Sequence, residues 1–132
     1  MFSQFEQIQK RFPKPKGILI FSAHWEEPSW TILDHDTPSL YYDYYGFPPE
    51  SYNLSYSMRS SSELRNHVKQ HLLKSGVELK TNKERGYDHG VFIPMLMMYP
   101  EGKVPVIQIS LLNHLDPEAH FRMGQSLREL IK

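Results

Sequence analysis

The sequence predicts an α/β fold with three layers, in which helices cover both faces of a mostly parallel sheet. Two apolar runs, residues 17–21 and 105–110, lack the polar alternation of a half-exposed strand and are typical of central parallel strands buried on both faces. Between them, Leu64, Val68 and Leu72 mark one face of an amphipathic helix. Strands that alternate with helices along the chain favour this layered α/β/α class.

Composition indicates one small domain over residues 1–132, with 39% hydrophobic residues. Lys plus Arg and Asp plus Glu both number 15, so no basic surface for nucleic acid is expected. No apolar run reaches the roughly 18 residues of a transmembrane helix, and no secretory signal is recognisable. Cysteine is absent, which excludes disulfides and thiolate metal sites. We expect a cytoplasmic protein that binds neither nucleic acid nor membrane.

The first half of the chain is expected to contain a helix, two strands and a long loop. Residues 1–12 place apolar side chains at helical spacing before two prolines break the pattern. After the first apolar run, residues 30–33 predict a short second strand. Residues 34–56 are rich in tyrosine and proline, and a loop of this length is usually functional. We interpret it as a pocket wall; the alternative is an Ω-loop that packs its own rings.

Helix ends and a further strand are predicted in the second half. Ser60 and Glu63 have the spacing of a capping box, which predicts a helix that ends near residues 75–76. Residues 77–81 alternate between apolar and polar side chains and predict a strand at or near a sheet edge. Asp116, followed by proline, predicts the start of the last helix.

Two histidines stand at the ends of predicted elements. His24 follows the run 17–21, and the carboxyl ends of strands are where open α/β sheets bind ligands. An imidazole there can bind metal or move a proton; the alternative is a structural histidine beside a core Trp25. His67 and His71 also have a spacing that suits a metal, but they flank a buried stripe and favour an exposed or boundary pair.

His89 precedes an apolar run that is expected to be a buried helix over residues 91–100. A side chain at this point lies near the positive end of the helix dipole and beside free backbone N–H groups. His89 is therefore suited to orienting an anionic or phenolic substrate.

Six segments of the chain form a recognisable set. In order they are Ser22-Ala23-His24-Trp25, Asp36-Thr37-Pro38, Tyr45-Gly46-Phe47-Pro48, Gly86-Tyr87-Asp88-His89-Gly90, Met98-Tyr99-Pro100 and Pro105-Val106-Ile107-Gln108-Ile109-Ser110. Together they resemble the LigB-type class III extradiol ring-cleavage dioxygenases, and within that family the 4,5-DOPA dioxygenase group. The resemblance implies a phosphorylase/hydrolase-like α/β/α fold and an oxidoreductase that opens the ring of a catechol, such as DOPA, with O2.

The resemblance also implies a set of site residues and a metal. The metal would be non-haem Fe(II), with Zn(II) as the alternative described for close relatives. His24 would be a metal ligand, and His89 a catalytic and substrate-binding histidine. Tyr45 and Phe47, in the aromatic loop, would contact the substrate.

Two family elements do not occur in this sequence. Members of the family begin with a strand and an H-G-S-P-like element, and they carry a G-N-x-x-H-N-like histidine in a C-terminal half. Without these, only His24 matches the family's ligands, and the spacing of Glu26, Asp36 and Asp88 favours none of them as a substitute. We expect an incomplete domain that lacks its first strand and C-terminal half, does not cleave rings by itself and self-associates through an uncovered sheet edge.

Two other functions remain open from the sequence. One is a non-catalytic binding or regulatory protein on the same scaffold, because function does not follow from fold. The other is a zinc hydrolase, which ranks last because no carboxylate base is placed beside two ligands.

Overall fold

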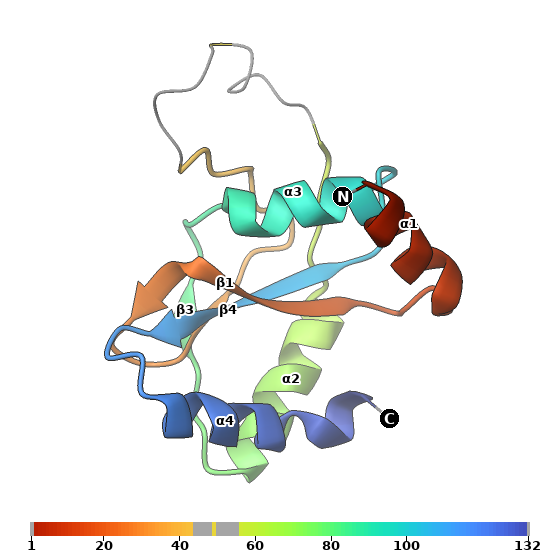
Figure 1. The fold of residues 1–132 in the computed structure, drawn as a ribbon. Coiled ribbons are helices and arrows are strands. Elements are labelled where there is room, and N and C mark those ends of the chain that lie inside the picture. Colours follow the sequence, from red (N-terminus) through yellow and green to blue (C-terminus); the bar gives the residue numbers. More distant parts are fainter. Residues whose placement is uncertain (1, 44–48, 50–55, 132) are drawn as a thin grey trace.

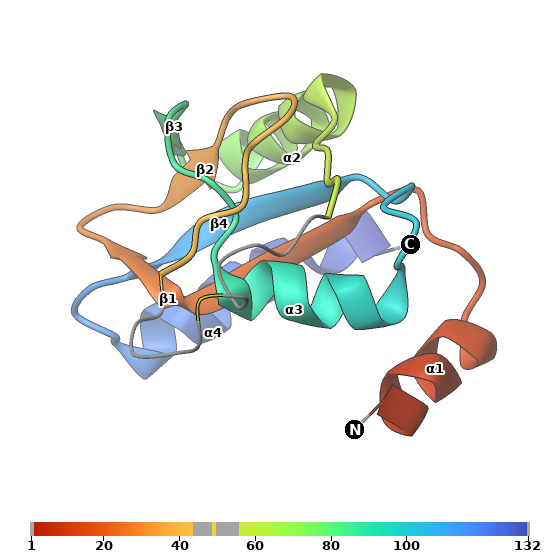
Figure 2. The same cartoon turned by 90° about the horizontal axis from the view of Figure 1, so that it is seen from above.

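The computed structural model describes residues 2–43, 49 and 56–131 and has three layers. Figure 1 shows α3 and α1 on one side of the sheet and α2 and α4 on the other, and Figure 2 shows the same layers from above. The predicted α/β/α class is therefore confirmed. The elements are α1 (Phe2–Arg11), β1 (Ile18–Glu27), β2 (Thr31–Leu33), α2 (Ser62–Lys74), β3 (Lys80–Asn82), α3 (His89–Met98), β4 (Val106–Leu112), α4 (Pro117–Ser126) and the 3-10 turn η2 (Arg128–Ile131).

The sheet has the strand order β1-β4-β2-β3 and is mostly parallel, as predicted. β1 pairs with β4 and β2 pairs with β3 in parallel, whereas β2 and β4 are antiparallel. The prediction that residues 17–21 form a central strand is wrong, because β1 lies at the edge of the described sheet and β4 is central. An apolar run indicates that both faces of a strand are covered, and it contains no information on whether both edges are paired.

Both faces of β1 are in fact covered, by different helices. Ile18 and Ile20 pack against the cluster beneath α3, which includes the fully buried Phe92. Leu19 and Phe21 pack against the second cluster, formed with α2 and α4. This alternation explains why the sequence of the strand shows no polar face.

β1 continues further than predicted, and its pairing changes where the histidine lies. Phe21 pairs with Ile109, but the next pair is Glu26 with Leu111, so residues 22–25 lie opposite Ser110 alone. His24 is therefore inside a long bulge of β1, whereas we predicted that it follows the strand. A bulge of this kind turns side chains away from the regular alternation; His24 is exposed while Trp25 is buried.

The remaining predicted elements are confirmed with small shifts. Ser61, and not Ser60, caps α2, because its side-chain oxygen accepts a hydrogen bond from the backbone N–H of Leu64. Asp88 caps α3, which begins at His89 itself. Asp116 caps α4, as predicted. β3 lies at the sheet edge but begins three residues later than the predicted strand 77–81.

Part of the predicted pocket wall falls outside the structure. Tyr45 and Phe47 lie outside the described residues, so their predicted contact with substrate stays a prediction. Among the residues that the structure describes, no helix is long and apolar enough to cross a membrane.

Candidate functional site

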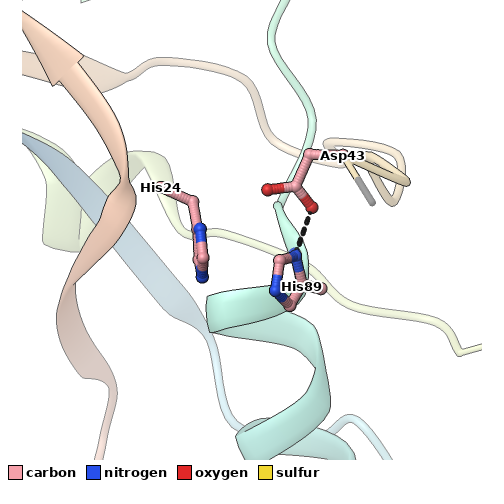
Figure 3. Close-up of side chains that lie close together, drawn as sticks. All are labelled: His24, Asp43 and His89. Carbon is pink, nitrogen blue, oxygen red and sulfur yellow. Dashed lines mark hydrogen bonds and ion pairs between the residues drawn. The ribbon is translucent and has the colours of Figure 1, made fainter. Parts of the chain in front are cut away.

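Three side chains from distant parts of the sequence meet at one end of α3. His24 comes from the bulge of β1, His89 is the first residue of α3, and Asp43 lies in the loop after β2 (Figure 3). One ligand-type atom of each lies within 4.8 Å of the others. The two imidazole rings face each other with their centroids 4.1 Å apart and a tilt of 37°. The fold therefore joins the two histidines that the sequence singled out, and adds a carboxylate.

Asp43 is bonded to His89 at two points. Its Oδ1 accepts hydrogen bonds from the backbone N–H of His89 at 3.0 Å and makes a 2.6 Å contact with the ring Nδ1. Burial raises the pKa of the Asp43 carboxyl group, but the hydrogen bonds from His89 outweigh it and hold the pKa below the usual 3.8. Asp43 is therefore a carboxylate at neutral pH, and it contacts the site through His89.

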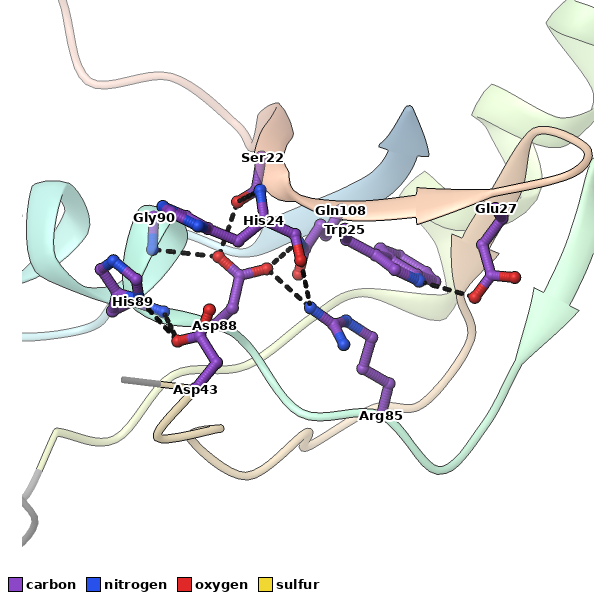
Figure 4. A network of polar contacts seen from close by, with 10 residues as sticks. All are labelled: Ser22, His24, Trp25, Glu27, Asp43, Arg85, Asp88, His89, Gly90 and Gln108. Atoms are coloured by element: carbon purple, nitrogen blue, oxygen red, sulfur yellow. Dashed lines mark hydrogen bonds and ion pairs between the residues drawn. The ribbon is translucent and has the colours of Figure 1, made fainter. Parts of the chain in front are cut away.

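A second carboxylate, Asp88, lies beneath the histidines and is fully buried. Figure 4 shows the four hydrogen bonds that it accepts, from Ser22 Oγ at 2.6 Å, Gly90 N at 2.9 Å, Gln108 Nε2 at 2.7 Å and Arg85 Nη2 at 3.1 Å. A buried charge is tolerated when it is paired and hydrogen-bonded in this way. Both oxygens of Asp88 are occupied, so it joins α3 to β1 and β4 and is not placed to bind a metal.

The contacts of Asp88 extend to the backbone of His24. Ser22 Oγ donates to Asp88 and accepts a hydrogen bond from the His24 N–H at 3.1 Å. Arg85 Nη2 contacts the His24 carbonyl oxygen at 3.3 Å, and its guanidinium lies over the Trp25 ring. These contacts fix the backbone of the bulge on both sides of His24, so the imidazole is held toward α3.

Gly90 allows the bulge of β1 to approach the first turn of α3. A Cβ atom at this position would lie 2.6 Å from Ser22 Oγ and 2.8 Å from His24 Cδ2. Contacts this short force a side chain to move. The glycine in the Asp-His-Gly segment therefore makes room for the ring of His24.

The backbone N–H groups at the start of α3 are used inside the protein, which corrects one prediction. The N–H of His89 bonds to Asp43, that of Gly90 bonds to the Asp88 side chain, and those of Val91 and Phe92 bond to the Asp88 carbonyl. We predicted that the N–H groups beside His89 are free. Because Asp43 and Asp88 cap the helix, an approaching substrate meets the imidazoles and not the helix amides.

The structure leaves the other candidate residues outside the cluster of His24, Asp43 and His89. Asp36 is bonded to Arg65, and Glu26 is exposed on β1. His67 is exposed, and His71 is half-buried with its Nε2 2.6 Å from the carbonyl oxygen of Ser126. The two histidines are therefore the exposed or boundary pair that the sequence predicts. The sequence analysis did not identify Asp43 as a site residue. The only signal for it was its position in the aromatic loop, residues 34–56, that we interpret as a pocket wall.

The donors at the site fit a divalent transition metal in kind. Two imidazoles and one carboxylate form a set that non-haem Fe(II) and Zn(II) both accept. Ligands bonded at about 2.0–2.2 Å lie roughly 3–3.5 Å from one another, so a cluster spread over 4.8 Å would close slightly around an ion. Asp43 Oδ1 already accepts two hydrogen bonds from His89, which leaves its second oxygen for any metal contact.

Comparison with known proteins supports one family. The chain matches the family described as the catalytic LigB subunit of aromatic ring-opening dioxygenase over residues 1–132. It is 45% identical to a 4,5-DOPA dioxygenase extradiol of Beta vulgaris over 121 residues, which is 89% of this chain and 44% of that protein. It is 30% identical to a protein of the same name from Escherichia coli, over 96% of this chain and 46% of that protein. It thus spans less than half the length of these curated relatives.

The fold of the chain also occurs in a solved structure. An uncharacterized protein of Escherichia coli K12 superposes with a TM-score of 0.75 and 24% sequence identity, covering 98% of this chain and 47% of that chain. At this identity the likeness concerns the fold alone. The family match covers the whole chain. This chain, with its histidine-bearing α/β fold, therefore belongs to the LigB family of aromatic ring-opening dioxygenase subunits.

Proposed function

We propose that this chain supplies the metal-binding and proton-accepting part of an extradiol dioxygenase that opens catechols with O2. The observation that carries the proposal is the pair of imidazoles 4.1 Å apart, one from the β1 bulge and one from the start of α3. Membership of the LigB family and the 4,5-DOPA dioxygenase relatives support the reaction class. A catechol such as DOPA is the substrate class that these relatives suggest.

His24 is the proposed metal ligand. Its ring is exposed, and its backbone is held by Ser22 and Arg85, so the imidazole is presented in a fixed direction at low entropic cost. The proposed ion is Fe(II), with Zn(II) as the alternative. Bound Fe(II) would supply a Lewis acid for the two catechol oxygens and a redox centre for O2.

His89 is the proposed base. A catechol bound beside His24 must lose a hydroxyl proton, and His89 is within reach because the two rings are in contact. In the overall reaction both oxygen atoms of O2 enter the product, a ring-opened semialdehyde acid, and the electrons come from the ring. No additional reductant is needed. His89 is half-buried, so it can exchange the proton with solvent afterwards.

A cavity beside His24 is large enough for a small aromatic molecule. It measures about 560 Å³ and is lined by His24, Trp25, Tyr41 and Arg85 among others. Ligand sites of this size usually combine aromatic walls with a few polar groups. Tyr45 and Phe47, which lie outside the described residues, stay proposed contacts of the substrate.

We also propose that the 132-residue chain does not cleave catechols by itself. It covers 44% and 36% of two of its curated relatives, and Asp43 is already bonded to His89. In the described residues His24 is then the single ligand that is fully available, and one imidazole competes poorly with water for Fe(II).

We further propose that the chain self-associates. β1 lies at an edge of the described sheet, and an unpaired strand edge can pair with the same edge of a second chain.

A chimera tests the proposed function. The chain would replace the matching segment of the Beta vulgaris relative, and O2 uptake and semialdehyde absorbance would be followed with L-DOPA after anaerobic loading with Fe(II). We expect turnover in the chimera and none in the isolated chain. His24→Ala should lose bound iron, and His89→Ala should keep iron and lose turnover. His67→Ala, at an exposed position on α2, is the matched control and should behave as the unaltered chimera.

The same assay separates the alternatives. A chimera that binds iron and L-DOPA without consuming O2 would favour the non-catalytic binding protein. An iron content that is unchanged in His24→Ala would refute the ligand assignment.

A further inference from the structure

We propose that Asp43 is a positioning residue for His89, which fixes the imidazole in the Nδ1–H tautomer and leaves Nε2 as the proton acceptor of the site. The proposal deepens the proposed function, on which its catalytic consequence rests. Asp43 is not among the residues that the sequence motifs singled out, nor among the carboxylates considered there as metal ligands.

The geometry of the contact carries the inference. One oxygen of Asp43 reaches the backbone N–H of His89 at 3.0 Å and the ring Nδ1 at 2.6 Å. A carboxylate can only accept hydrogen bonds, so the proton of this short contact belongs to Nδ1. The neutral ring then has its lone pair on Nε2. Because Oδ1 bridges backbone and ring, the carboxylate also restricts the rotation of the His89 side chain.

The burial of the two groups gives this contact its strength. The side chain of Asp43 is 11% exposed and that of His89 is 32% exposed. Water therefore has little access to the bond between them, whereas the imidazole of His89 also contacts the ring of His24. A hydrogen bond to a carboxylate in such surroundings is stronger than a neutral one. The arrangement holds the inner ring nitrogen, Nδ1, in its protonated form.

The alternative role of Asp43 is that of a third metal ligand beside His24 and His89. Both bonds to His89 use one oxygen of Asp43, so a metal would be bound through the other oxygen, and the three groups, which are spread over 4.8 Å, would have to close around it. Positioning requires no rearrangement. The two roles differ in what the removal of the charge does to metal affinity, which makes them separable by experiment.

The first test reads the tautomer and does not depend on turnover. Long-range ¹H–¹⁵N spectra of the 132-residue chain, with His89→Ala to assign the signals, should show His89 with its proton on Nδ1. Asp43→Ala removes the acceptor, so the Nε2–H form should gain population. Asp43→Asn keeps an acceptor oxygen and should retain part of the Nδ1–H form. Asp36→Asn makes the same chemical change at a residue that is bonded to Arg65, and should leave the His89 signals unchanged.

The second test separates positioning from ligation. The Zn(II) affinity of the chimera, measured by competition with a chromophoric chelator, should stay within about twofold in Asp43→Asn, whereas loss of a ligand weakens binding much more. In the chimera, Asp43→Asn should lower kcat by about 10²-fold with little change in KM for L-DOPA, as expected when a base is misoriented. A tenfold loss of Zn(II) affinity would overturn the proposal in favour of a metal ligand.

The two proposals fail in different ways. An Nε2–H tautomer in the unaltered chain, or unchanged His89 signals in both Asp43 variants, would overturn the positioning role. If the unaltered chimera shows no turnover while the tautomer depends on Asp43, the dioxygenase function fails and the positioning role stands. Backbone amide spectra of each variant show whether the fold is kept, and Asp43→Asn decides the question if Asp43→Ala does not fold.

Discussion

Two networks of aspartate and arginine side chains connect the elements of this protein, and they end in different places. The ion-pair network consists of Asp34, Asp36, Arg65 and Lys69. The site network consists of Asp88, Ser22, Arg85, Gln108 and the backbone of His24. Both join a helix to a strand. The ion-pair network closes on itself between α2 and the end of β2, whereas the site network ends at an exposed imidazole.

The difference shows which property distinguishes the site network from the ion-pair network. Arg65 is nearly fully buried and is bonded to two aspartates, so buried charge is not restricted to the site. Asp88 is also buried, but Ser22 and Arg85 connect it to the backbone of His24, whose side chain is exposed and touches a second histidine. Buried charge alone therefore does not distinguish the two networks; the site network differs in holding the backbone on both sides of an exposed histidine.

The largest expected effect comes from breaking the centre of the site network. Asp88→Ala leaves Arg85 without its buried partner and removes the acceptor of Ser22 and Gln108. We expect the free energy of unfolding to fall by about 3–5 kcal/mol, as for other broken buried pairs. Urea unfolding followed by circular dichroism measures it. A loss below about 1 kcal/mol would show that the network contributes little to stability.

A smaller loss is expected from the ion-pair network. In Arg65→Met the apolar stem is replaced by a side chain of similar length, and Asp34 keeps its contact with Lys69. We expect a loss of about 2 kcal/mol. Zn(II) affinity and the His89 spectrum should not change, because Arg65 bonds to Asp34, Asp36 and the carbonyl of His35 and not to the site. A change in either would show that the two networks are coupled.

Much of the fold could be predicted from the sequence, because covered faces leave a period in the apolar pattern. The runs that became β1 and β4 and the stripe of α2 were found in this way. The edge position of β1 and its bulge were not, since both depend on pairing with β4. Which strand β1 pairs with, and where the pairing shifts, depends on the partner strand β4. The sequence of β1 alone contains no pattern that shows it.

The candidate site divides in the same manner. His24 and His89 stood out because each adjoins an apolar run. Asp43 did not, because its partner His89 is 46 residues away and an aspartate among tyrosines in a loop has no periodic neighbour. A contact between a loop and a helix start appears only when the chain is folded.

A matched pair of glycine substitutions sharpens the comparison at the site. In Gly90→Ala the new Cβ meets Ser22 Oγ and His24 Cδ2 at 2.6 and 2.8 Å, so the ring of His24 must move. We expect a loss of about 1–2 kcal/mol from overpacking and weaker Zn(II) binding. In Gly124→Ala, on α4, the Cβ meets nothing within 4 Å, and the helix should gain up to about 1 kcal/mol. Equal Zn(II) affinities in the two variants would contradict the role given to Gly90.

The smallest effect is the dependence of the ion-pair network on pH. Burial raises the pKa of Asp34, but hydrogen bonds and the charges of Lys69 and Arg65 outweigh it, so the pKa lies below its usual 3.8. Because the folded value is the lower one, the stabilisation is complete above the unfolded value and is lost as the pH falls through the folded value. The gap in unfolding free energy between the unaltered protein and Asp34→Asn, about 1 kcal/mol, should be constant between about pH 5 and 7 and shrink below about pH 4. Glu101→Gln, from the exposed pair with Lys103, should show no such gap, and a gap for Asp34→Asn that widens toward acid would contradict the assignment.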